Sequence, residues 1–251
     1  MKTKIDDIEV YYERHGAGEP LVFSHGWLED CTMWDTQVEH LAKNYAVIVY
    51  DHRGYGRSDK PREHYSIQTL SDDLFALLHN LQLERVTLIG FSMGGMMALV
   101  FALDHPHILS KLVLVGATAK AAFTMHLARV LRYLLPYPRF LRVVGARMFY
   151  KPSPQIVGDM LVRARRANRY AAFESLREFT SNYDVRERVS TIQVPTLIVV
   201  GEQDTINLEA SRLLHRKIKG SELHIVPNSG HAVMLEKPEE FTHILKTTLS
   251  I

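Results

Sequence analysis

The chain has 251 residues, of which 46% are hydrophobic and 23% charged, which is ordinary for a soluble globular domain and excludes a disordered or fibrous protein. The formal net charge of +2 is too small to indicate nucleic-acid binding, and no apolar run approaches the length of about 18 residues that a membrane-spanning helix needs. A single cysteine, Cys31, excludes an intrachain disulfide. The amino-terminal segment lacks the apolar centre of a signal peptide, so the sequence predicts a cytoplasmic protein without integral membrane association.

Short runs rich in Val, Ile and Leu alternate with segments of helical periodicity, which is typical of a mostly parallel sheet covered on both faces. The predicted strands are Lys2–Ile5, Ile8–Glu13, Pro20–Ser24, Ala46–Asp51, Val86–Gly90, Lys111–Gly116, Val194–Gly201 and Glu222–Pro227. The predicted helices are Trp34–Asn44, Ile67–Leu81, Gly95–His105, Leu208–Lys219 and Pro238–Leu249. The first two strands are expected to form an antiparallel hairpin, and the chain as a whole to be an α/β protein.

The alternation stops between Ala117 and Gln193, where the pattern is helical and interrupted by prolines. We interpret residues 120–185 as a helical lid inserted into a core made of residues 1–119 and 186–251. From Lys120 to Thr180 there are 12 Lys and Arg residues against 3 Asp and Glu, a charge of about +9, while the rest of the chain carries about −7. The insertion therefore differs from the core in charge as well as in pattern.

The sequence GFSMGG at positions 90–95 follows an apolar strand directly and opens a helix of small and apolar residues. This context is typical of a nucleophile elbow, in which a serine occupies a strained turn between strand and helix and flanking glycines permit close approach of the chain. The N–H groups at the start of the helix point toward a developing oxyanion. The motif therefore predicts Ser92 as a nucleophile rather than as part of a turn that only packs.

A serine hydroxyl attacks a carbonyl at neutral pH only when a histidine base is within reach. The chain has 13 histidines, of which six fall in predicted helices or in the insertion. His231 instead follows the last predicted strand, in a loop at the same carboxyl edge of the sheet as Ser92. We therefore expect His231 to be the general base.

A carboxylate must orient the base. After a GxSxG elbow the three residues are expected in the order serine, acid, histidine along the chain, so the acid should lie between Ser92 and His231. The strand that ends at Gly201 is followed by Glu202 and Asp204. The preceding strand, Lys111–Gly116, is followed by no carboxylate. Asp204 is the preferred acid because of its position in the loop, and Glu202 is the alternative.

Two backbone N–H groups must also stabilise the tetrahedral intermediate. We expect them from Met93, which follows the nucleophile, and from Trp27, in the loop after an earlier strand. Gly26 would let this loop approach the site, and the side chain of Trp27 or Leu28 would form the wall of the substrate pocket. His25 is expected to hydrogen-bond neighbouring loops and is assigned no proton transfer.

These motifs occur in a fixed order along the chain. They are HG at 25–26, DHRGYGRSD at 51–59, GFSMGG at 90–95, GEQD at 201–204 and GH at 230–231. The series resembles the signature motifs of the α/β-hydrolase superfamily over nearly the whole chain, and most weakly in the insertion. The resemblance implies an eight-stranded, mostly parallel sheet with helices on both faces, a helical lid after the sixth strand, and a structural role for residues 51–59. Similar elbows occur in esterases, enol-lactonases, cofactor-free haloperoxidases and carbon–carbon bond hydrolases.

The insertion carries arginines at a spacing of three, Arg129 and Arg132, then Arg163, Arg166 and Arg169, which would align each set on one helix face. A solvated basic surface is the plainest interpretation. A second is a binding surface for an anionic substrate or an acidic acyl carrier protein, which would resemble the pimeloyl acyl-carrier-protein methyl ester esterases. Attachment to an anionic membrane surface is a third.

The sequence as a whole predicts a serine hydrolase that cleaves carboxylic esters of a small-molecule substrate through an acyl-enzyme intermediate, without a metal or organic cofactor. Lactones and thioesters are close alternatives to esters. Two other functions on the same fold stay open, a lyase of the SHCHC synthase type and a small-molecule receptor, since fold alone does not choose among them.

Overall fold

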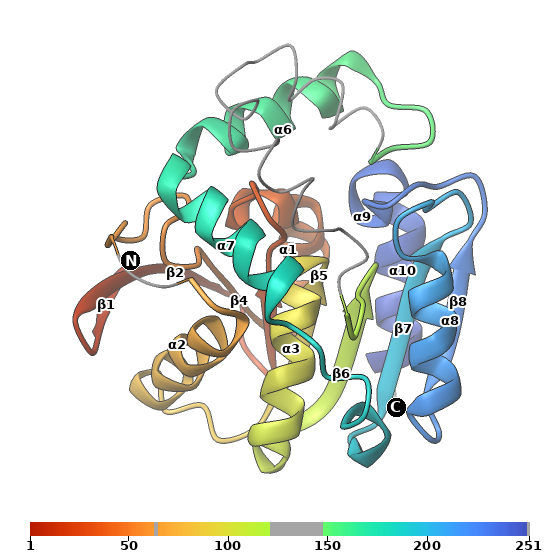
Figure 1. Ribbon diagram of the computed structural model, residues 1–251, viewed down its shortest axis with the longest axis horizontal. Coiled ribbons are helices and arrows are strands. Elements are labelled where there is room, and N and C mark those ends of the chain that lie inside the picture. The colour runs from red at the N-terminus through yellow and green to blue at the C-terminus, as the bar shows by residue number, and fades with distance from the viewer. Residues whose placement is uncertain (63–64, 121–147, 250–251) are drawn as a thin grey trace.

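The fold centres on one eight-stranded sheet in the order β1-β2-β4-β3-β5-β6-β7-β8 (Figure 1). The computed structural model describes residues 1–62, 65–120 and 148–249. The strands are β1 (Lys2–Ile5), β2 (Ile8–His15), β3 (Pro20–Ser24), β4 (Ala46–Tyr50), β5 (Val86–Phe91), β6 (Leu109–Val115), β7 (Thr196–Gly201) and β8 (Glu222–Val226). The β1–β2 and β2–β4 pairs are antiparallel and the other pairs are parallel, so the predicted mostly parallel sheet and its first hairpin are confirmed.

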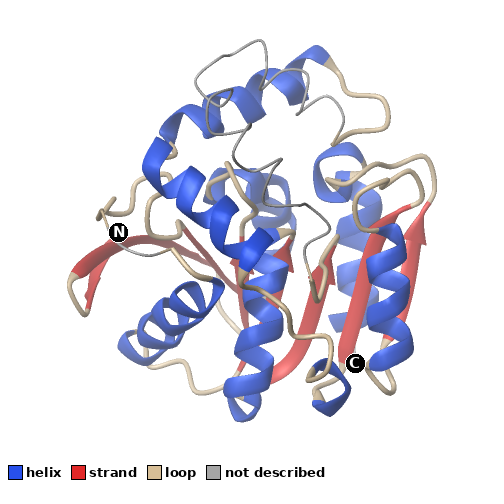
Figure 2. Ribbon diagram, in the orientation of Figure 1, coloured by secondary structure: helices blue, strands red, loops and turns tan. Residues whose placement is uncertain are grey.

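Helices cover both faces of the sheet (Figure 2). One face carries α2 (Ile67–Asn80), α3 (Met93–Asp104) and α8 (Leu208–Lys217), and the other carries α1 (Asp35–Leu41) and α10 (Pro238–Leu249), with the short α9 (Val233–Glu236) before α10. Successive residues of each strand point to opposite faces of the sheet. Leu88 and Leu112 belong to the core under α2 and α3, while Ile89 and Val113 belong to the core under α1 and α10. Strands buried on both faces are apolar at every position, which explains the continuous apolar runs in the sequence.

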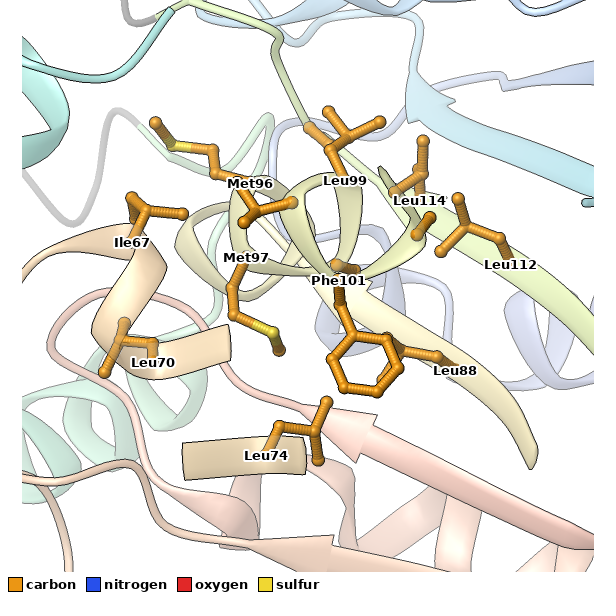
Figure 3. Packing of buried hydrophobic residues seen from close by; sticks show 14 of the residues in the cluster. Ile67, Leu70, Leu74, Leu88, Met96, Met97, Leu99, Phe101, Leu112 and Leu114 are labelled. Atoms are coloured by element: carbon orange, nitrogen blue, oxygen red, sulfur yellow. The ribbon is translucent and has the colours of Figure 1, made fainter. Parts of the chain in front are cut away.

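Helix α3 is surrounded by apolar partners on several sides (Figure 3). Met97 and Phe101 lie between Leu70 and Leu74 of α2 and Leu88 of β5. A helix buried in this way has no polar face, which agrees with its sequence of small and apolar residues. The packing holds the amino-terminal end of α3 at the carboxyl edge of the sheet.

The observed elements differ from the predicted ones mainly at their ends. Helix α3 begins at Met93, two residues before the predicted start at Gly95, because the helix starts immediately after the turn at Ser92. Strand β7 begins at Thr196, after Pro195, which has no N–H to donate to a neighbouring strand. Within the described residues, four short helical segments were not predicted: α9 and the 3₁₀ turns Cys31–Trp34, Pro106–Ile108 and Val189–Thr191.

Between β6 and β7, the described residues form α6 (Pro154–Arg166) and α7 (Arg169–Ser181), which arch over the carboxyl edge of the sheet (Figure 1). Helical structure in this part of the insertion agrees with the sequence pattern. That residues 120–185 act as a lid stays a prediction. No helix in the described ranges is long and apolar enough to cross a membrane.

The predicted alignment of Arg163, Arg166 and Arg169 on one helix face is wrong. Helix α6 ends at Arg166, Ala167 is extended, and α7 begins at Arg169. The break arises because the Asn168 side chain accepts hydrogen bonds from two N–H groups at the start of α7 and so caps a new helix. The other predicted set, Arg129 and Arg132, lies outside the described residues.

Candidate active site

Ser92 occupies the turn between β5 and α3 in a strained backbone conformation, with φ 51° and ψ −112°. Such a conformation costs a non-glycine residue about 1–3 kcal/mol and persists only where the surroundings impose it. The Ser92 N–H donates to the Val115 carbonyl at the end of β6, over 2.9 Å, which anchors the turn to the sheet. The strain and the anchor are those expected of a nucleophile elbow.

Close packing around the turn explains the glycines on either side of it. A Cβ on Gly94 would lie 2.5 Å from the Ser24 carbonyl oxygen, and one on Gly90 would lie 2.5 Å from the Gly94 carbonyl oxygen. A Cβ on Gly26 would lie 2.8 Å from the Phe91 ring and 3.4 Å from the Ser92 Cβ. The loop after β3 therefore lies directly against the serine turn, at a distance that only glycine permits.

Ser92, His231 and Asp204 form a continuous hydrogen-bonded chain. His231 Nε2 lies 3.0 Å from Ser92 Oγ, and His231 Nδ1 lies 2.8 Å from Asp204 Oδ2. An ionised carboxylate only accepts hydrogen bonds, so it holds the proton on Nδ1 and leaves Nε2 as an acceptor facing the serine hydroxyl. The structure thus brings together the three residues that the sequence predicted, and their geometry suits proton transfer from the serine to the histidine.

The Asp204 carboxylate is held ionised by its surroundings. Burial alone would raise its pKa, but His231 and the backbone N–H groups of Asn207 and Ile206 bring the pKa below its usual range. The Ile206 and Asn207 N–H groups donate to Oδ1 over 2.9 Å and 3.0 Å, respectively, which leaves Oδ2 for His231. The alternative acid, Glu202, instead accepts from the Asn228 N–H and is exposed, so the structure places it away from the histidine.

Replacing Asp204 with asparagine is expected to lower kcat for ester hydrolysis by about 10⁴-fold, because an amide that donates to Nδ1 would favour the wrong histidine tautomer. Glu202→Gln is the matched control, since it makes the same chemical change two residues away on an exposed side chain, and it should leave kcat within about twofold of the wild type. Steady-state kinetics on a p-nitrophenyl ester measures both. Comparable losses in the two variants would contradict the assignment of Asp204.

The loop after β3 is shaped by a tight turn. The Glu29 N–H donates to the Gly26 carbonyl over 3.3 Å, and Leu28 lies within the turn at φ 62°. The Trp27 side chain points to the insertion, where its Nε1 donates to the Ala172 carbonyl of α7 over 2.7 Å. Met93 is the first residue of α3, so its N–H has no acceptor within the helix. These positions suit the two predicted oxyanion donors, Trp27 and Met93.

His25 is fully buried, and both of its ring nitrogens have partners. Nε2 lies 3.0 Å from the His52 N–H and so accepts, which puts the proton on Nδ1, 2.8 Å from the Gly26 carbonyl oxygen. Burial lowers the pKa of His25 and keeps the ring neutral. His25 therefore links two loops, in line with its predicted task.

Residues 51–59 brace the loops below the site, as the resemblance implied. Asp51 accepts from the Cys31 N–H and the Arg57 N–H, over 2.8 Å and 2.7 Å. Arg53 forms a buried two-pronged ion pair with Asp73 of α2, over 2.5 Å and 2.6 Å. Burial raises the pKa of the Cys31 thiol, which keeps it protonated and suits a packing residue.

Two residues that sequence reasoning did not single out support the histidine and the aspartate. Gly116, just after β6, has φ 52°, and a Cβ there would lie 2.9 Å from His231 Nδ1 and 3.4 Å from Asp204 Oδ2. Asn207 donates from Nδ2 to the Gly116 carbonyl over 2.6 Å. A role for Gly116 could have been predicted from its position directly after an apolar strand. Nothing in the sequence indicated a role for Asn207.

Glu236 of α9 is a third residue that the sequence did not indicate. Its carboxylate accepts from the Gly230 N–H over 2.6 Å and from the Tyr150 N–H over 2.8 Å. The His231 N–H donates to the Met148 carbonyl over 2.7 Å. The histidine loop is therefore fastened to the chain that enters α6.

The two predicted substrate-binding arginines of α6 are already paired with acidic residues of the core. Arg163 is buried and its Nε donates to Glu29, while Arg166 Nη1 lies 3.0 Å from Asp30 Oδ2. Burial raises the pKa of Glu29 to about 7, against the opposing effect of Arg163. Arg163 is therefore not part of a solvated basic surface, because the acidic residues of the loop after β3 lie against α6. That these arginines bind substrate stays a prediction. Arg169 is exposed at the start of α7.

In the ranges that the structure describes, no group of three or more His, Cys, Asp or Glu side chains has the geometry of a metal site. The chemistry that Ser92, His231 and Asp204 support is that of their hydrogen-bonded chain. It consists of a hydroxyl, a base that takes its proton and a carboxylate that orients the base.

Comparison with known proteins agrees with this fold. The family model described as the alpha/beta hydrolase fold matches residues 19–142. The AB hydrolase superfamily protein YisY of Bacillus subtilis is 33% identical over 98% of this chain and 96% of its own length, and 3-oxoadipate enol-lactonase 2 of Acinetobacter baylyi is 28% identical over 97% and 94%. The solved structure of an esterase from Exiguobacterium antarcticum matches with a TM-score of 0.94 and 31% identity over the full length of both chains. The chain therefore belongs to the α/β-hydrolase superfamily.

Proposed function

We propose that the protein is a serine hydrolase that cleaves carboxylic esters of small molecules through an acyl-enzyme intermediate. The observation that carries the proposal is the hydrogen-bonded chain from Ser92 through His231 to Asp204, which starts at a strained elbow serine. Hydrogen-bonded geometry between nucleophile, base and orienting acid is the signature of nucleophilic catalysis. The names of the esterase and enol-lactonase relatives support the same reaction class.

In the first step, Ser92 Oγ attacks the ester carbonyl carbon while His231 Nε2 accepts the hydroxyl proton. The carbonyl oxygen becomes an oxyanion, and we propose that the backbone N–H groups of Trp27 and Met93 donate to it. Asp204 stays ionised and stabilises the imidazolium. The tetrahedral intermediate then collapses, the carbon–oxygen bond to the alcohol breaks, and His231 returns the proton to the leaving alkoxide.

In the second step, water attacks the acyl-enzyme while His231 accepts one of its protons. Collapse of the second intermediate releases the carboxylic acid and returns the proton to Ser92 Oγ. Every proton moves between substrate, water, Ser92 and His231, so the proposed reaction needs no metal or organic cofactor.

The side chains near the serine favour an apolar acyl group. Trp27 packs edge to face against Phe179 of α7, with ring centroids 6.3 Å apart. Phe179 belongs to the apolar cluster that includes Met93 and Tyr183, and Trp27 packs against this cluster. An apolar wall on the insertion side is what an acyl chain needs. The pairing of Arg163 and Arg166 with Glu29 and Asp30 gives no support to an acidic carrier protein as the partner.

The test is turnover by the purified protein. We expect hydrolysis of p-nitrophenyl esters and covalent labelling of Ser92 by a fluorophosphonate, located by peptide mapping. The buried Ser175 of α7 is an internal control, since it is a serine without a histidine partner in the described part of the chain and should stay unlabelled. Protein that is folded but neither turns over esters nor is labelled would contradict the proposal, and would leave the receptor and lyase interpretations.

A further inference from the structure

The loop after β3 is joined to the insertion by three side-chain contacts within four consecutive residues. Trp27 donates to the Ala172 carbonyl of α7, Glu29 pairs with Arg163, and Asp30 pairs with Arg166. We call the two ion pairs, Glu29–Arg163 and Asp30–Arg166, the tether. The same loop carries the Trp27 N–H, whereas none of the tether side chains belongs to the hydrogen-bonded chain from Ser92 to Asp204.

The two pairs of the tether lie in different environments. The side chains of Glu29 and Arg163 are 3% and 8% exposed, so this pair is largely removed from water. Asp30 is 2% exposed but Arg166 is 44% exposed, so the second pair is partly screened by solvent. A buried ion pair is a poor source of stability, because desolvation offsets most of the attraction, yet it fixes geometry strictly. This favours a positional role for the Glu29–Arg163 pair.

The backbone turn after β3 couples the position of Glu29 to that of Trp27. The Glu29 N–H closes a turn onto the Gly26 carbonyl, and Leu28 inside the turn is held at φ 62°, a region that leucine rarely adopts. Gly26 in turn lies against Phe91 and Ser92. A shift of Glu29 is therefore expected to move the Trp27 amide relative to the serine, because the two residues belong to the same hydrogen-bonded turn.

We propose that Glu29 and Arg163 are positioning residues that hold the Trp27 N–H at the oxyanion, with Asp30–Arg166 as a second, weaker support. The inference rests on the proposed function. It assigns to the insertion a part in catalysis besides its predicted role as a lid: α6 fixes one of the two oxyanion donors. A donor that stabilises only the transition state affects kcat far more than KM, which gives the tether a distinctive kinetic signature.

The test compares two double variants that each remove one buried ion pair. Glu29→Gln/Arg163→Gln removes the buried pair of the tether without leaving a lone charge. Arg53→Gln/Asp73→Asn is the matched control, because its side chains are 7% and 6% exposed and the ion pair joins the 51–59 loop to α2 rather than to α6. Assays at about pH 8.5, above the pKa of Glu29 of about 7, keep that carboxyl ionised in the wild type.

The tether variant is expected to lose at least about tenfold in kcat with KM changed by less than about threefold. Its Ki for a trifluoromethyl ketone should rise by a similar factor, because this inhibitor forms a tetrahedral adduct on Ser92 whose oxygen occupies the oxyanion position. The control should keep kcat and Ki within about twofold while losing a similar amount of thermal stability. A tether variant that matches the control in kcat and Ki would overturn the proposal.

Arg166→Gln keeps the proposal testable if the double variant does not fold, since that side chain is partly exposed. It should lower kcat by about two- to threefold at constant KM, and an unchanged kcat would count against the tether. A folded wild-type protein without ester turnover or Ser92 labelling would overturn the proposed function and the tether together. An active wild-type protein whose tether variant matches the control in kcat and Ki would overturn the proposal for the tether and leave the proposed function standing.

Discussion

Replacing Ser92 with alanine is expected to lower kcat for p-nitrophenyl ester hydrolysis by about 10⁴- to 10⁶-fold and to abolish fluorophosphonate labelling. The alanine removes the oxygen that lies 3.0 Å from His231 Nε2, so no covalent intermediate can form. Folding should be nearly unaffected, because the Ser92 side chain contributes no helix cap and the change removes a single oxygen. Circular dichroism and thermal unfolding check this point.

The same prediction extends to a double variant, because the residues act as a unit. His231→Ala should cost about as much as Ser92→Ala, and Ser92→Ala/His231→Ala should be no slower than either single variant. Losses that multiply would mean that the two side chains act independently, which would contradict a shared proton transfer. His215, in the last turn of α8, offers a matched control, since its ring lies 3.1 Å from Ser221 Oγ and has no part in the chain from Ser92 to Asp204: His215→Ala should leave kcat unchanged.

Replacing Gly116 with alanine is expected to lower kcat by about 10²-fold, although the residue supplies no catalytic group. The new Cβ would meet His231 Nδ1 at 2.9 Å and Cε1 at 3.0 Å, so the imidazole must shift away from Ser92 or from Asp204. The φ of 52° also disfavours alanine, which adds a loss of about 1–2 kcal/mol in the free energy of unfolding.

Gly220→Ala separates these two effects. Gly220 has φ 76°, and within the described ranges a Cβ there would meet no heavy atom within 4 Å. This variant should show a similar loss in the unfolding free energy, measured by urea denaturation, with kcat within about twofold of the wild type. If both variants lost activity equally, backbone strain alone would explain the result and steric pressure on His231 would not.

Sequence patterns predicted the sheet and the chain order of the site, because these depend on local features. Continuous apolar runs marked strands buried on both faces, and the parallel arrangement carried the loops after β5, β7 and β8 to one edge. Ser92, Asp204 and His231 follow those three strands, so a correct reading of the strands placed them together. The choice of Asp204 over Glu202 followed from loop position and agrees with the observed hydrogen bonds.

The prediction from the sequence was wrong where a regular spacing of arginines continued past the end of a helix. Arg163, Arg166 and Arg169 are spaced as on one helix, but Asn168 caps a new helix between the last two. Their charge also suggested an anion-binding face. In the structure, Arg163 and Arg166 are paired with Glu29 and Asp30, and these partners are more than 130 residues away along the chain. Charge counted along a sequence does not include such partners, because ion pairs form across space.

By itself, the sequence determined the α/β architecture and the identity and order of the serine, acid and histidine, because strand periodicity and turn chemistry act over a few neighbouring residues. Only the tertiary structure decided which groups surround these residues and the loop after β3. The contact of Gly116 with His231, the hydrogen bond from Asn207 to the Gly116 carbonyl and the Glu29–Arg163 ion pair each join segments far apart in the chain. Their roles depend on distances of about 3 Å between atoms, which packing sets and local pattern does not encode.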